Sequence, residues 1–218
     1  MENALIILFG LTMLYMAATS RLMAHIRILV LQGILLFLIC YFGMEHADVL
    51  TILFLTFETL IVKAIVIPMF LNKVVKQTHE YRDMEANIPH FYCLVISSVI
   101  LFAGFLISDF HFPAIKMINP IYFGVSIAVI IISLILITIK HKILTNVIEF
   151  ITMENGIFLL SLSVAKEMPV IVNLGVLLDV FIAVFILGML VREIDHEFHD
   201  LEVSHLSDLK DYESAAYT

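Results

Sequence analysis

The chain has 218 residues, of which 61% are hydrophobic and 15% charged, and its formal net charge is −8. Ordinary soluble domains have about 25% charged residues, so this composition excludes a typical soluble protein and favours one that lies in a lipid bilayer. The sequence has no basic patch, which excludes nucleic-acid binding through phosphate contacts.

Apolar runs long enough to cross the roughly 30 Å hydrocarbon core as helices recur along the chain. In chain order they cover residues 3–20, 26–43, 49–71, 91–109, 119–139, 143–165 and 170–192. The sequence therefore predicts an all-α, polytopic membrane protein with seven transmembrane helices. No Lys or Arg precedes Arg21, so the first run lacks the basic region of a cleaved signal peptide and is expected to be retained.

The runs also predict a domain organisation. We expect a seven-helix membrane domain over residues 1–192 and an acidic cytoplasmic tail over 193–218. Within the membrane domain we expect an N-terminal three-helix unit (1–73), a connecting helix (90–110) and a second three-helix unit (118–192).

The basic residues predict the orientation in the membrane. One set of alternate loops and the tail hold nine of them, and the other loops hold only Lys116 and Lys166. Because cytoplasmic loops carry an excess of Lys and Arg, we expect the N-terminus outside and the C-terminus in the cytoplasm. The nine are Arg21, Arg27, Lys73, Lys76, Arg82, Lys140, Lys142, Arg192 and Lys210.

Ionisable residues inside the predicted spans are the main candidates for function. Glu58 and Lys63 lie in the third span, Glu154 in the sixth and Asp179 in the seventh. At 1.5 Å rise per residue the three acids lie about 14–16 Å deep, at one level near the midplane. A carboxylate there costs roughly 2.5–3.5 kcal/mol, whereas interhelical polar contacts average only about 0.6 kcal/mol.

A row of this kind can exchange protons, because burial favours a neutral acid whereas a nearby lysine favours the charged one. Alternatively, a single buried acid can be a neutral structural anchor between helices. Glu58 and Lys63 are five residues apart, which in an α-helix places them about 140° from each other. We therefore expect them to meet different partners. Asn155, Gln32 and Glu149 are expected to support the row.

The first three spans resemble the last three. The segment LQGILLFLI (31–39) matches ENGIFLLSL (154–162), and FETLIVKA (57–64) matches LDVFIAVF (178–185). This parallel repeat pairs Glu58 with Asp179 and Gln32 with Asn155. Small residues in the spans are expected to allow close helix approach, and Pro68 is expected to kink the third span. These small residues are Gly33, Gly156, Gly175 and Gly188.

Other side chains give little sign of a separate site. The two cysteines, Cys40 and Cys93, lie in predicted spans and provide no disulfide framework. All nine histidines fall in loops, at span ends or in the tail, where most are expected to be solvated. A metal site at His196 and His199 is conceivable, but we expect no metal and no catalytic residue in this chain.

The segment TMENGIFLL, followed by GVLLDVFIAVFILGMLV, resembles the hydrogenase-4 component E family, and FETLIVKAIVIPMF and LEVSHLSDLKD extend the resemblance along the chain. The last three spans also resemble the K subunit of respiratory complex I and the C subunit of multisubunit cation/proton antiporters. The K-type subunit carries two intramembrane carboxylates on successive helices. Glu154 matches the first, and Asp179 matches the second with a side chain shorter by one methylene.

The resemblance implies a non-catalytic, multi-pass inner-membrane subunit of a complex I-like [NiFe]-hydrogenase, often of the formate hydrogenlyase type. Its partners would be antiporter-like large subunits and the other membrane subunits, in the lipid bilayer. Cofactors are expected in partner subunits, as [NiFe] and iron–sulfur centres, and none here. Glu154, Asp179, Glu58 and Lys63 would relay protons.

Two other functions are compatible with the sequence. The chain could be a subunit of a stand-alone cation/proton antiporter, or a structural membrane adaptor whose polar residues only hold helices together. Apolar residues recur in the tail over 198–209, which favours docking of this segment on a neighbouring subunit, whereas acidic tails commonly stay unfolded.

Overall fold

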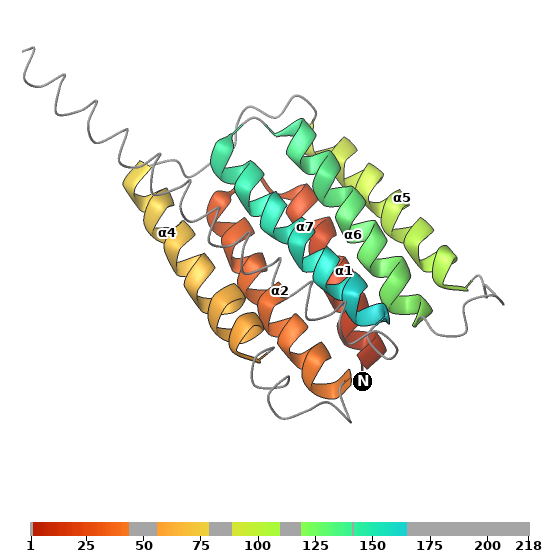
Figure 1. Cartoon of the computed structure of the whole chain (residues 1–218). Coiled ribbons are helices and arrows are strands. Elements are labelled where there is room, and N and C mark those ends of the chain that lie inside the picture. Colours follow the sequence, from red (N-terminus) through yellow and green to blue (C-terminus); the bar gives the residue numbers. More distant parts are fainter. Residues whose placement is uncertain (1, 44–55, 79–88, 110–118, 141, 165–218) are drawn as a thin grey trace, which may run out of the picture. The chain divides into compact units, whose positions relative to one another are not determined.

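A computed structural model describes residues 2–43, 56–78, 89–109, 119–140 and 142–164 (Figure 1). All of them belong to one compact unit, Met1–Val180. The predicted seventh span (170–192), including Asp179, lies outside the described residues, and so does the tail.

The described part of the chain is entirely helical, as predicted. Its elements are α1 (Glu2–Ala18), α2 (Leu22–Gly43), the π-helical segment η1 (Phe57–Val66), α4 (Ile67–Thr78), α5 (His90–Asp109), α6 (Pro120–Ile139) and α7 (Ile143–Val164). Four of them contain segments that are long and apolar enough to cross a membrane, namely Leu22–Phe42, His90–Ile107, Pro120–Ile139 and Ile143–Ser163. Helix α1, with 17 residues, is at the lower end of the length range for a membrane span.

Local sequence explains where α6 begins and ends. Pro120 occupies the first turn after the extended residue Asn119, where its missing N–H removes no helical hydrogen bond. At the other end Lys140 becomes extended while its N–H still donates to Leu136 O. The short connection to α7 then returns the chain alongside α6.

Contacts between helix ends show the relative direction of three helices. At one end the Tyr122 hydroxyl, near the start of α6, donates to Glu2 at the start of α1. There too the Asn119 N–H donates to Ser163 O, at the end of α7. Helices α1 and α6 therefore run in one direction and α7 runs opposite. This is the alternation predicted for spans one, five and six.

The helices pack in a defined set of neighbours. Helix α1 lies against α2, α5 and α6, while α2 lies against α7, η1 and α4, and α6 lies between α5 and α7 (Figure 1). The core between them is apolar, with Phe9, Leu36, Ile132 and Phe158 almost fully buried. Helix α7 therefore has neighbours from both predicted three-helix units.

Two glycines in this core permit close helix approach, as predicted. A Cβ at Gly33 of α2 would lie 2.9 Å from the backbone nitrogen of Ala64 in η1. A Cβ at Gly156 of α7 would lie 2.9 Å from Val129 Cγ1 of α6. Any larger residue at Gly33 must push η1 away from α2.

The third predicted span is wound differently from an α-helix over residues 57–66. The Ile67 N–H donates to Val62 O, five residues earlier, which is the hydrogen bond of a π-helix. Residues five apart in a π-helix lie one above the other on neighbouring turns. Positions 58 and 63 have this spacing and therefore lie near the same side of the helix. The separation of about 140° that α-helical winding predicts is therefore wrong for this segment.

The winding becomes α-helical at Ile67, one residue before Pro68. Proline lacks an N–H and crowds the carbonyl of the preceding turn, so the hydrogen-bond ladder is interrupted at this junction. The predicted irregularity at Pro68 is thus accompanied by a change of helix type. The helix itself continues to Thr78, beyond the predicted end at residue 71.

Candidate functional site

Helix α7 carries buried polar side chains at successive levels along an otherwise apolar helix. Glu149, Thr152, Glu154 and Asn155 are all buried. Glu154 points away from Glu149, since five residues at 100° each place them about 140° apart. Asn155 and Thr152 face α2 and α1, through Gln32 and Met16.

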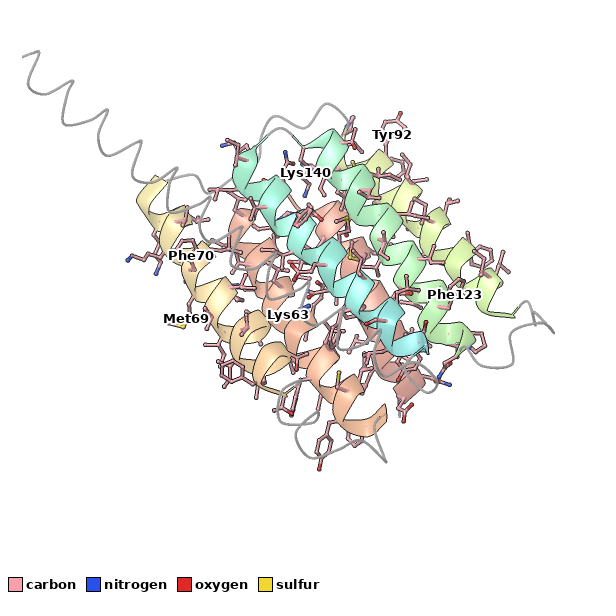
Figure 2. The ribbon with its side chains drawn as sticks, in the orientation of Figure 1. Lys63, Met69, Phe70, Tyr92, Phe123 and Lys140 are labelled. Atoms are coloured by element: carbon pink, nitrogen blue, oxygen red, sulfur yellow. The ribbon has the colours of Figure 1, made fainter. Side chains whose placement is uncertain are left out.

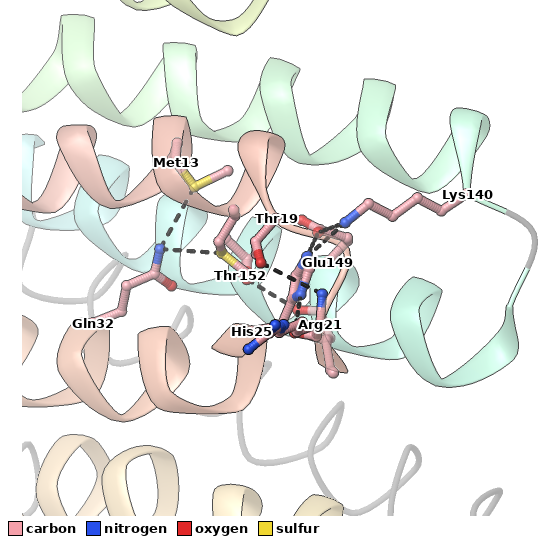
Figure 3. Close-up of polar contacts among 10 residues, drawn as sticks. Met13, Thr19, Arg21, His25, Gln32, Lys140, Glu149 and Thr152 are labelled. Atoms are coloured by element: carbon pink, nitrogen blue, oxygen red, sulfur yellow. Dashed lines mark hydrogen bonds and ion pairs between the residues drawn. The ribbon is translucent and has the colours of Figure 1, made fainter. Parts of the chain in front are cut away.

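Asn155 and Gln32 belong to a chain of hydrogen bonds that joins three helices. The Asn155 Nδ2 donates to Gln32 Oε1 at 3.2 Å, and the Gln32 Nε2 donates to Thr12 Oγ1 at 2.8 Å. The Thr12 hydroxyl in turn donates to Phe9 O at 2.6 Å. Figure 3 shows Gln32 reaching the sulfur of Met13 as well.

This amide chain links α7 to α2 and α2 to α1. Side-chain amides do not gain or lose protons in the physiological range, so the chain positions helices and does not carry protons. Gln32 and Asn155 bond to each other and to α1, and the support of the ionisable row that the sequence predicts for them stays a prediction. They are also the two residues that the predicted repeat pairs, and they bond directly to each other.

Lys63 lies in the interior between η1 and α7. Its side chain is buried, and its Nζ lies 4.8 Å from the centroid of the Phe158 ring. Such a cation–π contact is worth about 2 kcal/mol when it is desolvated. Figure 2 shows Lys63 directed into the helix bundle, whereas Met69 on the following helix points outward.

Phe158 follows Glu154 by one helical turn, and residues four apart share a face of an α-helix. Lys63 therefore lies on the face of α7 that presents Glu154. The Glu154 side chain itself is 2% exposed. Two of the four predicted relay residues, from η1 and α7, are thus brought to one face, while Asp179 lies outside the described residues. The side chain of Glu58, the fourth relay residue, also lies outside the described part of the structure.

A second buried ionisable cluster lies at the C-terminal end of α6. The Lys140 Nζ is 3.0 Å from Glu149 Oε1 and 2.6 Å from His25 Nε2, and His25 Nε2 is 3.5 Å from Glu149 Oε1 (Figure 3). The His25 Nδ1 bonds Arg21 O at 3.0 Å. His25 and Glu149 are 0% exposed and Lys140 is 4% exposed. We call these three side chains the end cluster.

The sequence analysis missed two members of the end cluster. Histidines at span ends are mostly expected to be solvated, but His25 is buried. Lys140 lies in the connection after α6, as expected for a loop residue, yet its side chain is buried too. Only Glu149 was selected, as a supporting residue. The members come from α2, from the residue after α6, and from α7, so no local spacing could have indicated the cluster. The only signal is that each residue borders or interrupts an apolar run.

The geometry assigns hydrogen-bonding roles within the end cluster. Arg21 O can only accept, so His25 Nδ1 carries the hydrogen and the neutral ring presents Nε2 as an acceptor. The Lys140 ammonium then donates both to this nitrogen and to Glu149. A buried ion pair needs such additional bonds, because taking two charges out of water costs several kcal/mol per ion.

The described residues offer proton-binding groups and not a metal site. They contain no group of three or more His, Cys, Asp or Glu side chains that could hold a metal ion. Cys40 and Cys93 are buried free thiols. What the arrangement can do chemically is hold and transfer protons within a helical bundle.

Fold and site together define an all-helical protein with four described helices able to cross a membrane and with ionisable groups buried between its helices. The chain is similar to hydrogenase-4 component E of Escherichia coli (strain K12), with 25% identity over 189 residues that cover 84% of this chain and 82% of the relative. The resemblance predicted from the sequence is thereby confirmed.

The same protein of Shigella flexneri is similar to the same extent. An uncharacterized protein of Mycobacterium tuberculosis (strain H37Rv) is 25% identical over 158 residues, or 70% of each chain. No protein-family model matches the chain. No solved structure matches it.

Proposed function

We propose that this chain is a non-catalytic membrane subunit of a [NiFe]-hydrogenase complex of complex I-like design, of the formate hydrogenlyase type. Its similarity to hydrogenase-4 component E over most of both chains supports this assignment. The four apolar helices support a place in the membrane. The [NiFe] and iron–sulfur centres, in this proposal, belong to partner subunits, and antiporter-like large subunits lie beside it.

Within that complex the chain contributes a proton relay that couples electron transfer to ion movement. The observation that carries this role is the buried face of α7 on which Glu154 lies one turn from Phe158, the residue whose ring Lys63 contacts. An acid and a base buried on one face of a helix can exchange a proton without leaving an uncompensated charge in the bilayer. Asp179 and Glu58 extend the relay to neighbouring subunits.

Replacing Glu154 by glutamine tests the relay. Glutamine keeps the size and most of the hydrogen bonding of glutamate but cannot exchange a proton. We expect the purified complex to assemble and to retain hydrogenase activity with artificial electron carriers, while ion translocation in reconstituted vesicles is lost.

Glu154→Asp is the matched control, because it keeps the titrating group and shortens the side chain by one methylene. It should retain part of the translocation that Glu154→Gln loses. If Glu154→Gln prevents assembly and Glu154→Ala does no worse, Glu154 is a structural anchor. Full translocation in Glu154→Gln would also rule the relay out.

The proposal includes seven spans in the inner membrane, with the N-terminus outside and the C-terminus cytoplasmic. The nine-to-two distribution of basic residues supports this orientation. A reporter active only in the cytoplasm should be active when fused after Thr218 and inactive when fused before Met1. The opposite pair of results would show that the orientation is inverted, and equal activities would show that the number of spans is not odd.

A further inference from the structure

The end cluster has a composition that a structural ion pair does not need. A lysine and a glutamate would suffice to tie α7 to the end of α6, yet the lysine is shared with a histidine from α2 at 2.6 Å. Histidine is the side chain whose unperturbed charge changes between pH 5 and 8. The cluster is thus a continuous contact of three groups that can each hold a proton.

Its place in the bundle connects this contact to the relay. Glu149 precedes Glu154 on α7 by five residues, which corresponds to about 7.5 Å along the helix axis. Thr152 lies between them, with its hydroxyl donating to Ile148 O at 3.0 Å. The end cluster therefore occupies the layer between the Glu154 level and the end of the bundle.

All but one of the other charged or titratable groups described at this end are at least partly exposed. From α5, His90 interacts electrostatically with His25, and Cys93 interacts with Lys140. His90 is partly exposed and Cys93 is buried. Arg21 and Arg27 are exposed and Lys142 is partly exposed. Water thus lies within a turn or two of a cluster whose own three side chains are buried.

We propose that the end cluster is the proton-access site of this subunit, through which protons pass between the aqueous phase and Glu154. The site rests on the proposed relay function and deepens it. By the charge distribution this end faces the cytoplasm, because Arg21, Arg27, Lys140 and Lys142 all belong to the basic set.

The transfer step balances without any other reactant. An aqueous proton protonates His25. A proton of the Lys140 ammonium moves to Glu149, so that an N–H bond breaks as an O–H bond to Oε1 forms. The neutral amine then takes the proton from His25 Nε2. Lys140 and His25 return to their starting states, and the net change is one proton added to the Glu149 carboxylate, from which it passes to Glu154.

Lys140→Arg separates this role from a structural one. Arginine keeps a permanent charge and can still bond Glu149, but a guanidinium does not deprotonate in proteins and so cannot hand on a proton. An ion pair that only joins helices would tolerate the change. For a transfer site we expect proton uptake to slow by about a hundredfold, the lower end of the effect of a positioned acid or base.

The measurement uses the full-length chain in lipid vesicles and follows the infrared C=O band of protonated carboxyl groups after a rapid drop in external pH. The bands of Glu149 and Glu154 are identified by their loss in Glu149→Gln and Glu154→Gln. We expect both bands to appear in the unmodified chain, Glu149 first, and to appear about a hundredfold more slowly in Lys140→Arg. Lys142→Arg, two residues away and partly exposed, should behave as the unmodified chain.

His25→Phe provides a second variant on a different helix, should Lys140→Arg fold poorly. It keeps an aromatic ring and removes the proton acceptor, and it should slow both bands as well. Normal rates in either folded variant, or a Glu149 band that never responds to pH, would overturn the access site. A silent Glu154 band in the unmodified chain beside a responsive Glu149 would instead refute the relay and leave a proton site at the bundle end.

Discussion

Replacing Lys63 by methionine should stop ion translocation while leaving the complex assembled. Methionine has a similar length and remains compatible with the Phe158 ring, but it removes the buried ammonium. Without that charge, ionising Glu154 inside the bundle costs more, and the acid keeps its proton more readily. Loss of about 1.4 kcal/mol of stabilisation lowers the ionised fraction about tenfold, so we expect translocation to fall at least that far in reconstituted vesicles.

The same substitution at Lys73 is a matched control. Lys73 lies ten residues further along the same continuous helical stretch but is exposed. Lys73→Met should therefore translocate ions as the unmodified protein does. Equal activity in the Lys63 and Lys73 variants would mean that Lys63 only packs against α7 and takes no part in a relay.

Gly33→Ala should lower both the stability of the protein and its translocation. The new Cβ would meet the Cβ and backbone nitrogen of Ala64 at 2.9 Å and its Cα at 3.0 Å. Backbone atoms cannot rotate away, so η1 must shift from α2, and overpacking of this kind costs about 1–3 kcal/mol. Because Lys63 precedes Ala64, the shift also moves its ammonium relative to Glu154.

Gly10→Ala distinguishes this effect from a general intolerance of larger residues at helix crossings. There the added Cβ would meet only side-chain methyl groups, Leu101 Cδ1 at 3.0 Å and Val125 Cγ1 at 3.2 Å. Thermal unfolding of the purified protein should show a clearly smaller loss for Gly10→Ala. If the two variants unfold at the same temperature, the contact between Gly33 and Ala64 does not limit the residue size at position 33.

The helical spans could be predicted because a membrane span is encoded locally. About 20 consecutive apolar residues are sufficient information, and the described helices α1, α2, α5, α6 and α7 begin and end within a few residues of the predicted runs. Lys63 and Glu154 could be selected for the same reason, since each interrupts such a run. That Lys63 reaches the face of α7 on which Glu154 lies depends on how the helices pack, which the local sequence does not indicate.

The features that sequence reasoning missed are those that depend on contacts between distant segments. His25 and Lys140 are 115 residues apart, and each looks solvated when only its own segment is considered. The π-helical winding of η1 was missed because hydropathy indicates a helix without indicating its hydrogen-bond pattern. Close packing of Gly104 against Gly124 O likewise requires knowing that α5 and α6 are neighbours.

The amide chain that joins α7, α2 and α1 has a fixed donor-to-acceptor direction, which a backbone carbonyl determines. Phe9 O can only accept, so the Thr12 hydroxyl donates its single hydrogen to it. Thr12 must then accept from the Gln32 Nε2, which leaves the Gln32 Oε1 to accept from Asn155. Reversing Gln32 would break its bonds to Thr12 and Asn155, and reversing Asn155 would break its bond to Gln32. Asn155 consequently presents its Oδ1, buried and lacking a hydrogen-bond partner among the described residues, as an obligate acceptor. The bundle thus presents a buried oxygen that can bond only the hydrogen-bearing form of a group that approaches it.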